Sequence, residues 1–280
     1  MPAFATPEPI TATVDVAVAT VNVVATDRAD TVVTVAPADP TKSGDVKAAD
    51  DTRVDFHDGA LTVSMSARWR YLSKSSVEIT VEVPTGSALQ GSALGSLYTQ
   101  GRLASCVFTS RAGDVWVDEV AGRAELRASA GNVVVGRALG PTDVVSSAGG
   151  VRIRELVGDA TIKCTNGYTE VGESAGTLRI HGAHGAITVH RSLGDTTAKS
   201  AHAGIRVEQA VGGTVQLENA FGPIEVGVPE GTAAWIDASS QHGSVRNSLQ
   251  GATGPDENDR TVEVRASTSY GDIVVRRPLG

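Results

Sequence analysis

Glycine-started segments with alternating valines recur through the middle of this chain, for example "GDVWV", "GNVVV" and "GAITV". Their first apolar positions are 18 residues apart: Val115, Val133, Val151, Thr169, Ile187 and Ile205. A second column lies two residues later: Val117, Val135, Ile153, Val171, Val189 and Val207. Because alternate side chains of a strand share one face, both columns are expected to point inward from one strand per repeat.

Two further columns keep the same period. One is followed each time by a glycine, and it comprises Ala121, Leu139, Val157, Ala175, Leu193 and Val211. The other comprises Phe108, Leu126, Val144, Ile162, Ile180 and Ala198. We expect both columns to be buried, with the glycine marking a corner that needs a positive φ. Each repeat would then hold about three short strands separated by bends.

The arrangement that buries all four columns is an all-β, single-stranded parallel β-helix, or β-solenoid, with about 18 residues per coil. Successive coils would pair in parallel at about 4.8 Å. After Val207 the period loosens, since Ile224 follows its predecessor Ile205 by 19 residues and the next strand begins near Val245. The polar segment 251–260 is expected to project as a loop from the solenoid.

The two ends of the repeat region are predicted to be closed differently. The last strand, "GDIVV", is followed by Arg276, Arg277 and Pro278, which are typical of a blunted sheet edge. Residues 1–86 alternate as strands, with a hairpin turning at Asp58-Gly59, and are expected to form an N-terminal antiparallel β cap. Residues 87–280 would form the solenoid, and residues 67–76 a loop before its first coil.

The amino-acid composition fits a narrow solenoid interior and limits the classes of function that the chain can have. Hydrophobic residues make up 41% of the chain but aromatic residues only 4%, so Val, Ala, Leu and Ile must fill the core. The net charge of -8, with scattered lysines and arginines, disfavours binding to nucleic acid. The start has no basic n-region or apolar h-region, and no later stretch is apolar enough to span a membrane. We therefore expect a cytoplasmic protein, found at the surface only if a non-classical route exports it.

Three stretches of this sequence resemble a known family. They are "VEITVEVPTGS" at 77–87, the "GDV-x-V" strands from Gly113 onward, and the closing "SYGDIVVRR" at 269–277. They are similar to the bacterial "putative adhesin" β-strand-repeat family of unknown function, and the N-terminal strands resemble its actinobacterial branch. The resemblance implies the solenoid fold and an adhesive role at a cell surface. The 18-residue coil is also similar to that of bactofilins, which polymerise end to end.

No catalytic residue, cofactor or metal site is predicted. Cys106 and Cys164 fall three coils apart at inward positions, so both are expected to be buried free thiols. "GESAG" at 172–176 matches a nucleophile-elbow pattern, but Ser174 occupies an ordinary coil position without a following helix. The acidic residues are scattered over different faces, unlike the paired carboxylates of glycoside hydrolases.

Aromatic and imidazole side chains are the candidate ligand surface. His184 and His202 are 18 residues apart, and the same corner carries Asn166 earlier and Phe221, His242 and Tyr270 after the period slips. This stripe would offer imidazoles to a metal or rings to a sugar, or else is a solvated ladder of like residues. Three further sets of outward or loop residues were weighed: Tyr98 with Trp116, Trp69 with Tyr71, and the charge pairs Arg152–Glu170 and Arg206–Glu225.

Both aromatic sets have two interpretations, whereas the charge pairs are expected to lie on a solvated face. Tyr98 and Trp116 form a contact patch unless the N-terminal cap or the 67–76 loop covers them. Trp69 and Tyr71 contact a ligand or pack against their own domain. Together these features indicate a non-catalytic scaffold or binding module for an unknown protein or glycan. The alternatives are a surface adhesin and a bactofilin-like polymer, but the charges and proline at 276–278 favour a monomer over a filament.

Overall fold

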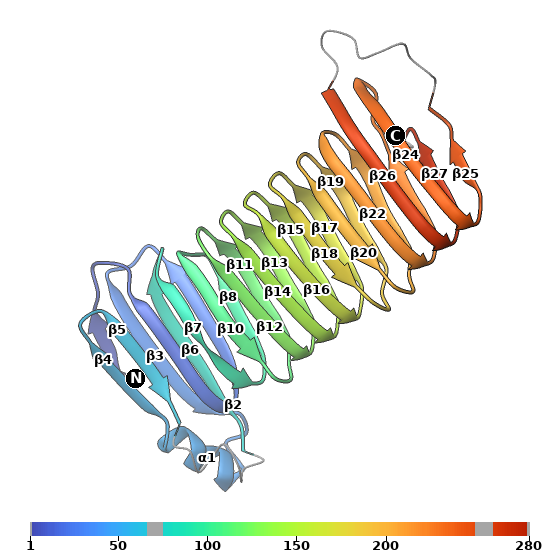
Figure 1. The fold of residues 1–280 in the computed structure, drawn as a ribbon. Helices are drawn as coiled ribbons and strands as arrows, with labels where there is room; N and C mark the ends of the chain where they lie inside the picture. The colour runs from blue at the N-terminus through green and yellow to red at the C-terminus, as the bar shows by residue number, and fades with distance from the viewer. Residues whose placement is uncertain (1, 66–74, 250–259, 279–280) are drawn as a thin grey trace. The chain divides into compact units, whose positions relative to one another are not determined.

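The computed structural model describes residues 2–65, 75–249 and 260–278, and it confirms the β-solenoid (Figure 1). Two units, Met1–Pro141 and Thr142–Gly280, are described separately below. Within the described residues the only α-helix is α1 (Ser43–Asp50), which the sequence analysis did not predict. No helix in the described ranges has the length and apolar character needed to cross a membrane.

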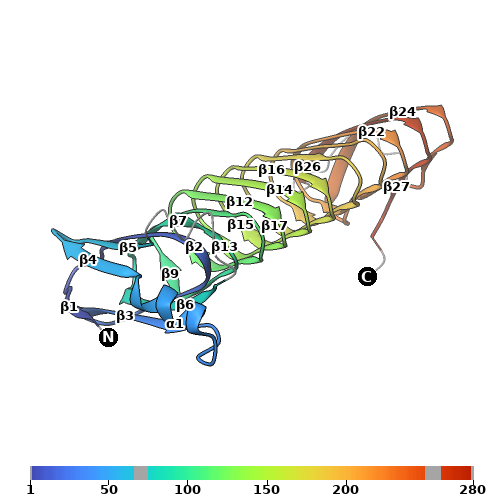
Figure 2. The same ribbon diagram turned by 90° about the horizontal axis from the view of Figure 1, so that it is seen from below.

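Each coil of the second unit contributes one strand to each of two parallel sheets (Figures 1 and 2). The first sheet contains β15 (Val151–Leu156), β17 (Thr169–Ser174), β19 (Ile187–Ser192), β21 (Ile205–Ala210) and β23 (Ile224–Gly227). The second contains β14 (Thr142–Ala148), β16 (Ala160–Asn166), β18 (Leu178–Gly182), β20 (Thr196–Ser200) and β22 (Gly213–Phe221). Each coil therefore has two strands, so the prediction of about three short strands per repeat is wrong.

The inward columns pair as the period predicts. In the first sheet the partners run Val151, Thr169, Ile187, Ile205 and Ile224, with the 19-residue step at the end. The column two residues later, from Ile153 to Val226, is also fully buried, and so is the column of Val144, Ile162, Ile180 and Ala198 in the second sheet. A dry aliphatic axis thus runs through the coils of this unit.

The column placed before the corner glycine is wrong by one residue. The buried side chain is Leu156, whereas Val157 is 41% exposed. The other coils bury the equivalent residues Val120, Ala138, Ser174, Ser192 and Ala210, and Val211 is the one predicted member of the column that is also buried. Two outward residues, such as Arg154 and Glu155, separate the second and third inward positions, so the strand bends there instead of ending. This bend merges the two expected short strands into one.

The C-terminal coils do not follow the order of the sequence. Strand β26 (Arg260–Tyr270) lies between β22 and β24 (Thr232–His242), and β27 (Ile273–Arg276) lies between β23 and β25 (Val245–Asn247). The chain skips one position after β23 and later returns to fill it. The last strand is therefore internal, and the prediction that Arg276, Arg277 and Pro278 blunt the final edge is wrong. That edge belongs to β24 and β25, while the predicted 251–260 loop lies almost entirely outside the described residues.

The first unit has the same interleaving at its N-terminal end. The long strand β2 (Thr11–Thr26) forms a complete coil. It pairs in parallel with β5 (Ala60–Ser64) and β6 (Val77–Pro84) on one side, and with β7 (Ala88–Leu94) and β8 (Leu97–Gln100) on the other. The later strands of this unit are β9 (Arg102–Leu103), β10 (Ser105–Ser110), β11 (Val115–Val120), β12 (Ala124–Ala130) and β13 (Val133–Ala138).

Antiparallel strands line the outer side of this end, which confirms the N-terminal cap. Strand β3 (Asp30–Pro37) pairs with β6, β1 (Ala3–Ala5) with β3, and β4 (Arg53–His57) with β5. The predicted hairpin is confirmed, since Asp58 and Gly59 both have positive φ, 47° and 74°, as a two-residue turn of this kind requires. The boundary between residues 86 and 87 stays a prediction.

Small polar side chains occupy one inward corner of the second sheet. The Ser146 hydroxyl donates to the Gly149 carbonyl at 2.9 Å, and the Cys164 thiol donates to the Gly167 carbonyl at 3.2 Å. These donors satisfy corner carbonyls that have turned away from the strand ladder. Both cysteines are buried and free, as predicted, and Cys164 stands where other coils have serine.

The pair Leu156 and Val157 tests the corrected column. Leu156→Ala should lower the free energy of unfolding by about 2–5 kcal/mol, because it leaves a cavity in the aliphatic axis. Val157→Ala should change it by only about 0.5 kcal/mol, as expected of an exposed position. Urea unfolding of both variants measures the difference, and equal losses would show that the column is misplaced.

Hydrogen exchange tests the interleaved C-terminal coils. The amides of β27 should exchange as slowly as those of β23, because β27 has a paired strand on each side. The amides of β25 should exchange fastest in this sheet, since one side is open. The opposite ranking, with β27 fraying before β25, would contradict the coil order.

Candidate functional site

Charged side chains on the outward face of the first sheet pair from coil to coil in the second unit. Arg152 Nη2 lies 2.9 Å from Glu170 Oε2, and Arg206 Nε lies 3.0 Å from Glu225 Oε2. Both pairs were predicted from the 18- and 19-residue spacings and are confirmed. In-register stacking holds each pair at close range without any special loop.

His190 lies between two carboxylates on this face. It is located at the bend of β19, where its Nδ1 is 2.8 Å from Glu208 Oε2 and its Nε2 is 3.2 Å from Glu170 Oε1. Hydrogen bonds to Glu208 and then to Glu170 raise the pKa of His190. The same contact with His190, followed by Arg152, lowers the pKa of Glu170. The two carboxylates thus favour the protonated imidazole, the form in which both ring nitrogens can donate.

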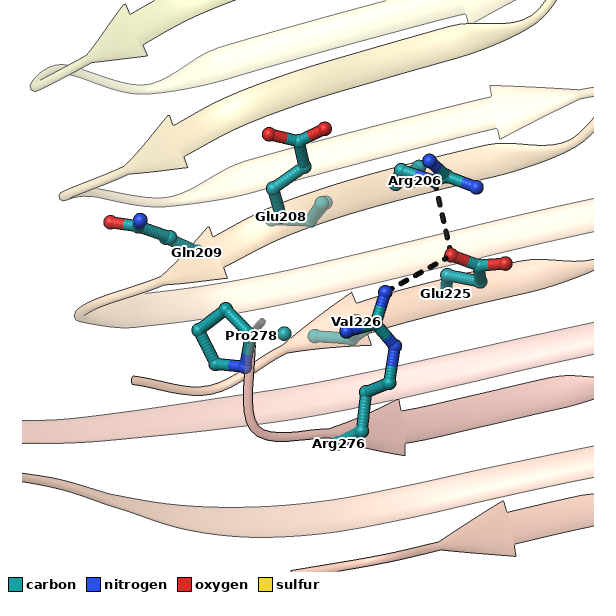
Figure 3. A pocket seen from close by; sticks show the side chains of 9 residues that line it. Arg206, Glu208, Gln209, Glu225, Val226, Arg276 and Pro278 are labelled. Carbon is teal, nitrogen blue, oxygen red and sulfur yellow. Dashed lines mark ion pairs between the residues drawn. The ribbon is translucent and has the colours of Figure 1, made fainter. Parts of the chain in front are cut away.

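A hollow of about 420 Å³ opens beside His190, a size within the usual range for small-molecule sites. Its lining comprises Arg152, Tyr168, Thr169, Glu170, Ala186, Thr188, His190, Arg206 and Glu208. A smaller hollow of about 180 Å³ lies further along the same face (Figure 3). There Glu225 is shared by Arg206 and Arg276, and Arg206 and Glu208 belong to the walls of both hollows.

This cluster does not form a metal site. Among the described residues, no group of three His, Cys, Asp or Glu side chains is placed to hold an ion. Glu170 and Glu208 bind opposite nitrogens of the same ring, so the imidazole separates them and their oxygens do not converge on one point.

The predicted corner residues are brought together as a continuous stack of rings in the second unit. The order is His184, His202, Phe221, Tyr270 and His242, with neighbouring ring centroids 4.5–5.5 Å apart. Tyr270 precedes His242 in this stack because β26 lies between β22 and β24. All five side chains are exposed. Each inner ring has a neighbour on both faces, so mainly ring edges are offered to a partner.

The other predicted aromatic residues lie elsewhere. Tyr98 and Trp116 are register partners in the first unit and are 40% and 48% exposed. The described N-terminal strands therefore do not cover them. The contact patch stays a prediction, because most of the 67–76 loop lies outside the described residues. Trp69 and Tyr71 lie outside the described residues.

Sequence reasoning missed Tyr168 and His190. The first outward position of each strand holds the predicted charge pairs, such as Arg152 and Glu170. The second outward position, at the bend two residues later, was not included in the prediction. That second column carries His190 and Glu208 at the same 18-residue spacing. A charge search along it would have found the imidazole between its carboxylates.

The remaining nucleophile candidates are buried. Ser174 ends strand β17 and is 1% exposed, with no helix following it. Burial raises the pKa of the Cys106 thiol to about 12 and also raises that of Cys164. A thiol that stays protonated is a poor nucleophile, so these cysteines serve packing.

Comparison with known proteins gives the family. The model of the Toastrack DUF4097 family matches residues 12–276, and this chain belongs to that family. No curated protein matches.

Two solved structures are similar over nearly their whole length. One is a "putative cell adhesion protein" from Clostridium sporogenes ATCC 15579, with 10% identity, TM-score 0.21, and 99% of this chain and 98% of that chain covered. The other is a "putative adhesin" from Bacteroides fragilis NCTC 9343, with 12% identity, TM-score 0.29, and 98% and 95% covered. TM-scores this low carry no functional information.

The pH dependence of stability tests the His190 contacts. Because folding raises the pKa of His190, its stabilisation is present below the ordinary histidine pKa of about 6.5 and is lost as pH rises through the raised value. His190→Gln should therefore cost more stability at about pH 6 than at about pH 9. Urea unfolding at both values measures this.

His181→Gln is the control, since His181 makes no ion pair within the described residues and should show little pH-dependent difference. An equal cost of His190→Gln at both pH values would show that its charge does not stabilise the coils.

Proposed function

We propose that this protein is a non-catalytic binding scaffold that presents side-chain ladders to a macromolecular partner. The observation that carries the proposal is that its titratable groups are occupied by one another. Both ring nitrogens of His190 contact a carboxylate, Glu208 and Glu170, and Arg206 pairs with Glu225. A general base needs a nitrogen within reach of a substrate proton, and both nitrogens of this ring already face a carboxylate.

Exposed aromatic side chains favour a binding role. The ring stack from His184 to His242 and the pair Tyr98–Trp116 are solvent-accessible, and aromatic residues are enriched at the centres of protein interfaces. A rigid stack loses little conformational entropy on binding, because its rings already hold one another in place. The ring stack is therefore our primary contact surface for a protein partner.

Adhesion at a cell surface, through a glycan or a protein, is the second candidate. The same exposed rings support it. The cytoplasmic location expected from the sequence stays a prediction. Fractionation of the native host, with detection of this chain in cytosol and envelope, separates the two candidates.

A bactofilin-like polymer is the third candidate. Filament growth requires a coil edge of one copy to pair with a coil edge of the next. The 11-residue strand β24 of the second unit has an open edge, but the N-terminal edge of the first unit carries the short antiparallel strands β1 and β4. We therefore propose a monomer, and light scattering that finds long polymers would contradict it.

The ring stack is tested by partner capture. The double variant Phe221→Ala/Tyr270→Ala should keep its fold and capture about a tenth or less of the partner that the wild type retains after crosslinking in host lysate. Trp235→Ala removes another exposed ring of this unit and should leave capture unchanged. Equal capture by all three proteins would overturn the role of the stack. A turnover reaction abolished by one fold-preserving substitution would overturn the non-catalytic assignment.

A further inference from the structure

The hollow beside His190 has the features of a binding site for an uncharged, hydroxyl-rich ligand. It is lined by one exposed aromatic ring, Tyr168, and otherwise mainly by polar and charged side chains. We propose that it binds one ring of a neutral glycan. This inference rests on the binding role proposed above and adds a ligand class and a site distinct from the ring stack.

Three polar groups around the hollow keep unused hydrogen-bonding capacity. Glu208 contacts His190 through Oε2, which leaves Oε1 as an acceptor. Arg206 contacts Glu225 through Nε, which leaves its terminal nitrogens as donors. The Thr188 hydroxyl has no hydrogen-bond partner within the described residues. An acceptor, a donor pair and a hydroxyl fit neighbouring hydroxyl groups of a sugar.

These groups are already oriented without a ligand. Glu208 is fixed by His190, and Arg206 by Glu225, so each of these two charged groups has one contact to hold it and a further position left to bind. Charged groups also make stronger hydrogen bonds to neutral hydroxyls than neutral groups do. Preorganised contacts of this kind reduce the entropy cost of binding a small ligand.

The charges favour a neutral ligand. The two guanidinium groups that line the hollow, Arg152 and Arg206, are matched by two carboxylates of the same lining, Glu170 and Glu208. With these charges balanced, the lining gives neither an anion nor a cation a strong long-range attraction. An acidic polymer would place its anions against Glu170 and Glu208, which is unfavourable.

Tyr168 supplies the apolar contact. Its side chain is 43% exposed, and the guanidinium of Arg152 lies 5.9 Å from the ring centroid. The negative face of an aromatic ring attracts the positively polarised C–H groups of a sugar ring. The ring lies over Gly150 of the preceding coil, where a Cβ would overlap it. The absence of a side chain at Gly150 therefore makes room for this ring.

Two substitutions disturb the ring without touching the hydrogen-bonding groups. Tyr168→Ala removes it. Gly150→Ala displaces it, and because Gly150 does not have a positive φ, the backbone tolerates alanine there. Tyr98→Ala is the matched control, because Tyr98 is a similarly exposed tyrosine that lines no part of this hollow. Melting temperatures verify that all three variants fold.

The experiment applies the full chain to immobilised oligosaccharides ending in neutral hexoses or N-acetylhexosamines, followed by calorimetry with the free sugar that binds best. The wild type and Tyr98→Ala should bind equally, and Tyr168→Ala and Gly150→Ala should each lose about tenfold in affinity. Binding should change less than about twofold between low and high salt, as expected for an uncharged ligand.

Three results would overturn the inference. They are no binding of the wild type to any neutral glycan, full binding by Tyr168→Ala, and salt-sensitive binding to acidic glycans alone. None of them bears on protein capture by the ring stack. If the glycan binds as expected but the Phe221→Ala/Tyr270→Ala variant captures as much protein partner as the wild type, only the role of the ring stack is overturned.

Discussion

In-register parallel pairing of coils is the constraint on which the rest of this structure depends. A coil cannot satisfy its own backbone hydrogen bonds, so each strand edge must be matched by the strand of the next coil at about 4.8 Å. Residues one period apart then occupy the same environment. At inward positions the environment is dry and narrow, which selects Val, Ile, Leu and Ala. At outward positions it places complementary side chains in contact, as with Arg152 and Glu170. At one corner it stacks rings from His184 to His242.

The same constraint explains how the ends are built. A terminal coil that followed the sequence order would have only one paired side and would fray. In the first unit, β2 is instead enclosed by strands that come later in the chain, and in the second unit β27 is enclosed by strands that come earlier. In each unit, the coil nearest to the chain terminus is thus paired on both sides. In the second unit, the strands left at the C-terminal edge are β24 and β25, which are internal in sequence, and β25 is only three residues long.

The sequence was sufficient to predict the features that recur in every coil, but not those that occur only once. The period located the inward columns at Val151 and Ile187, the outward charge pairs and the corner rings, because all of these depend only on spacing. It misplaced the buried residue at Val157, because the bend before Leu156 adds a residue that a strict alternation does not contain. It could not give the order of β25 and β27, because either order preserves the pattern of each strand. The site beside His190 was missed for a related reason, since it combines residues from two outward columns and from four coils.

The order of the C-terminal coils tests the pairing scheme most directly, and engineered disulfides can measure it. In a background without Cys106 and Cys164, cysteines at 225 and 274, and at 274 and 246, lie on register partners, about 4.8 Å apart. That separation is within the range of about 4.4–6.8 Å for a disulfide. Cysteines at 225 and 246 are two strands apart, about 9.6 Å. Mild oxidation should therefore link the first two pairs and leave the third reduced. Rapid crosslinking of 225 with 246, and none of 225 with 274, would contradict this account.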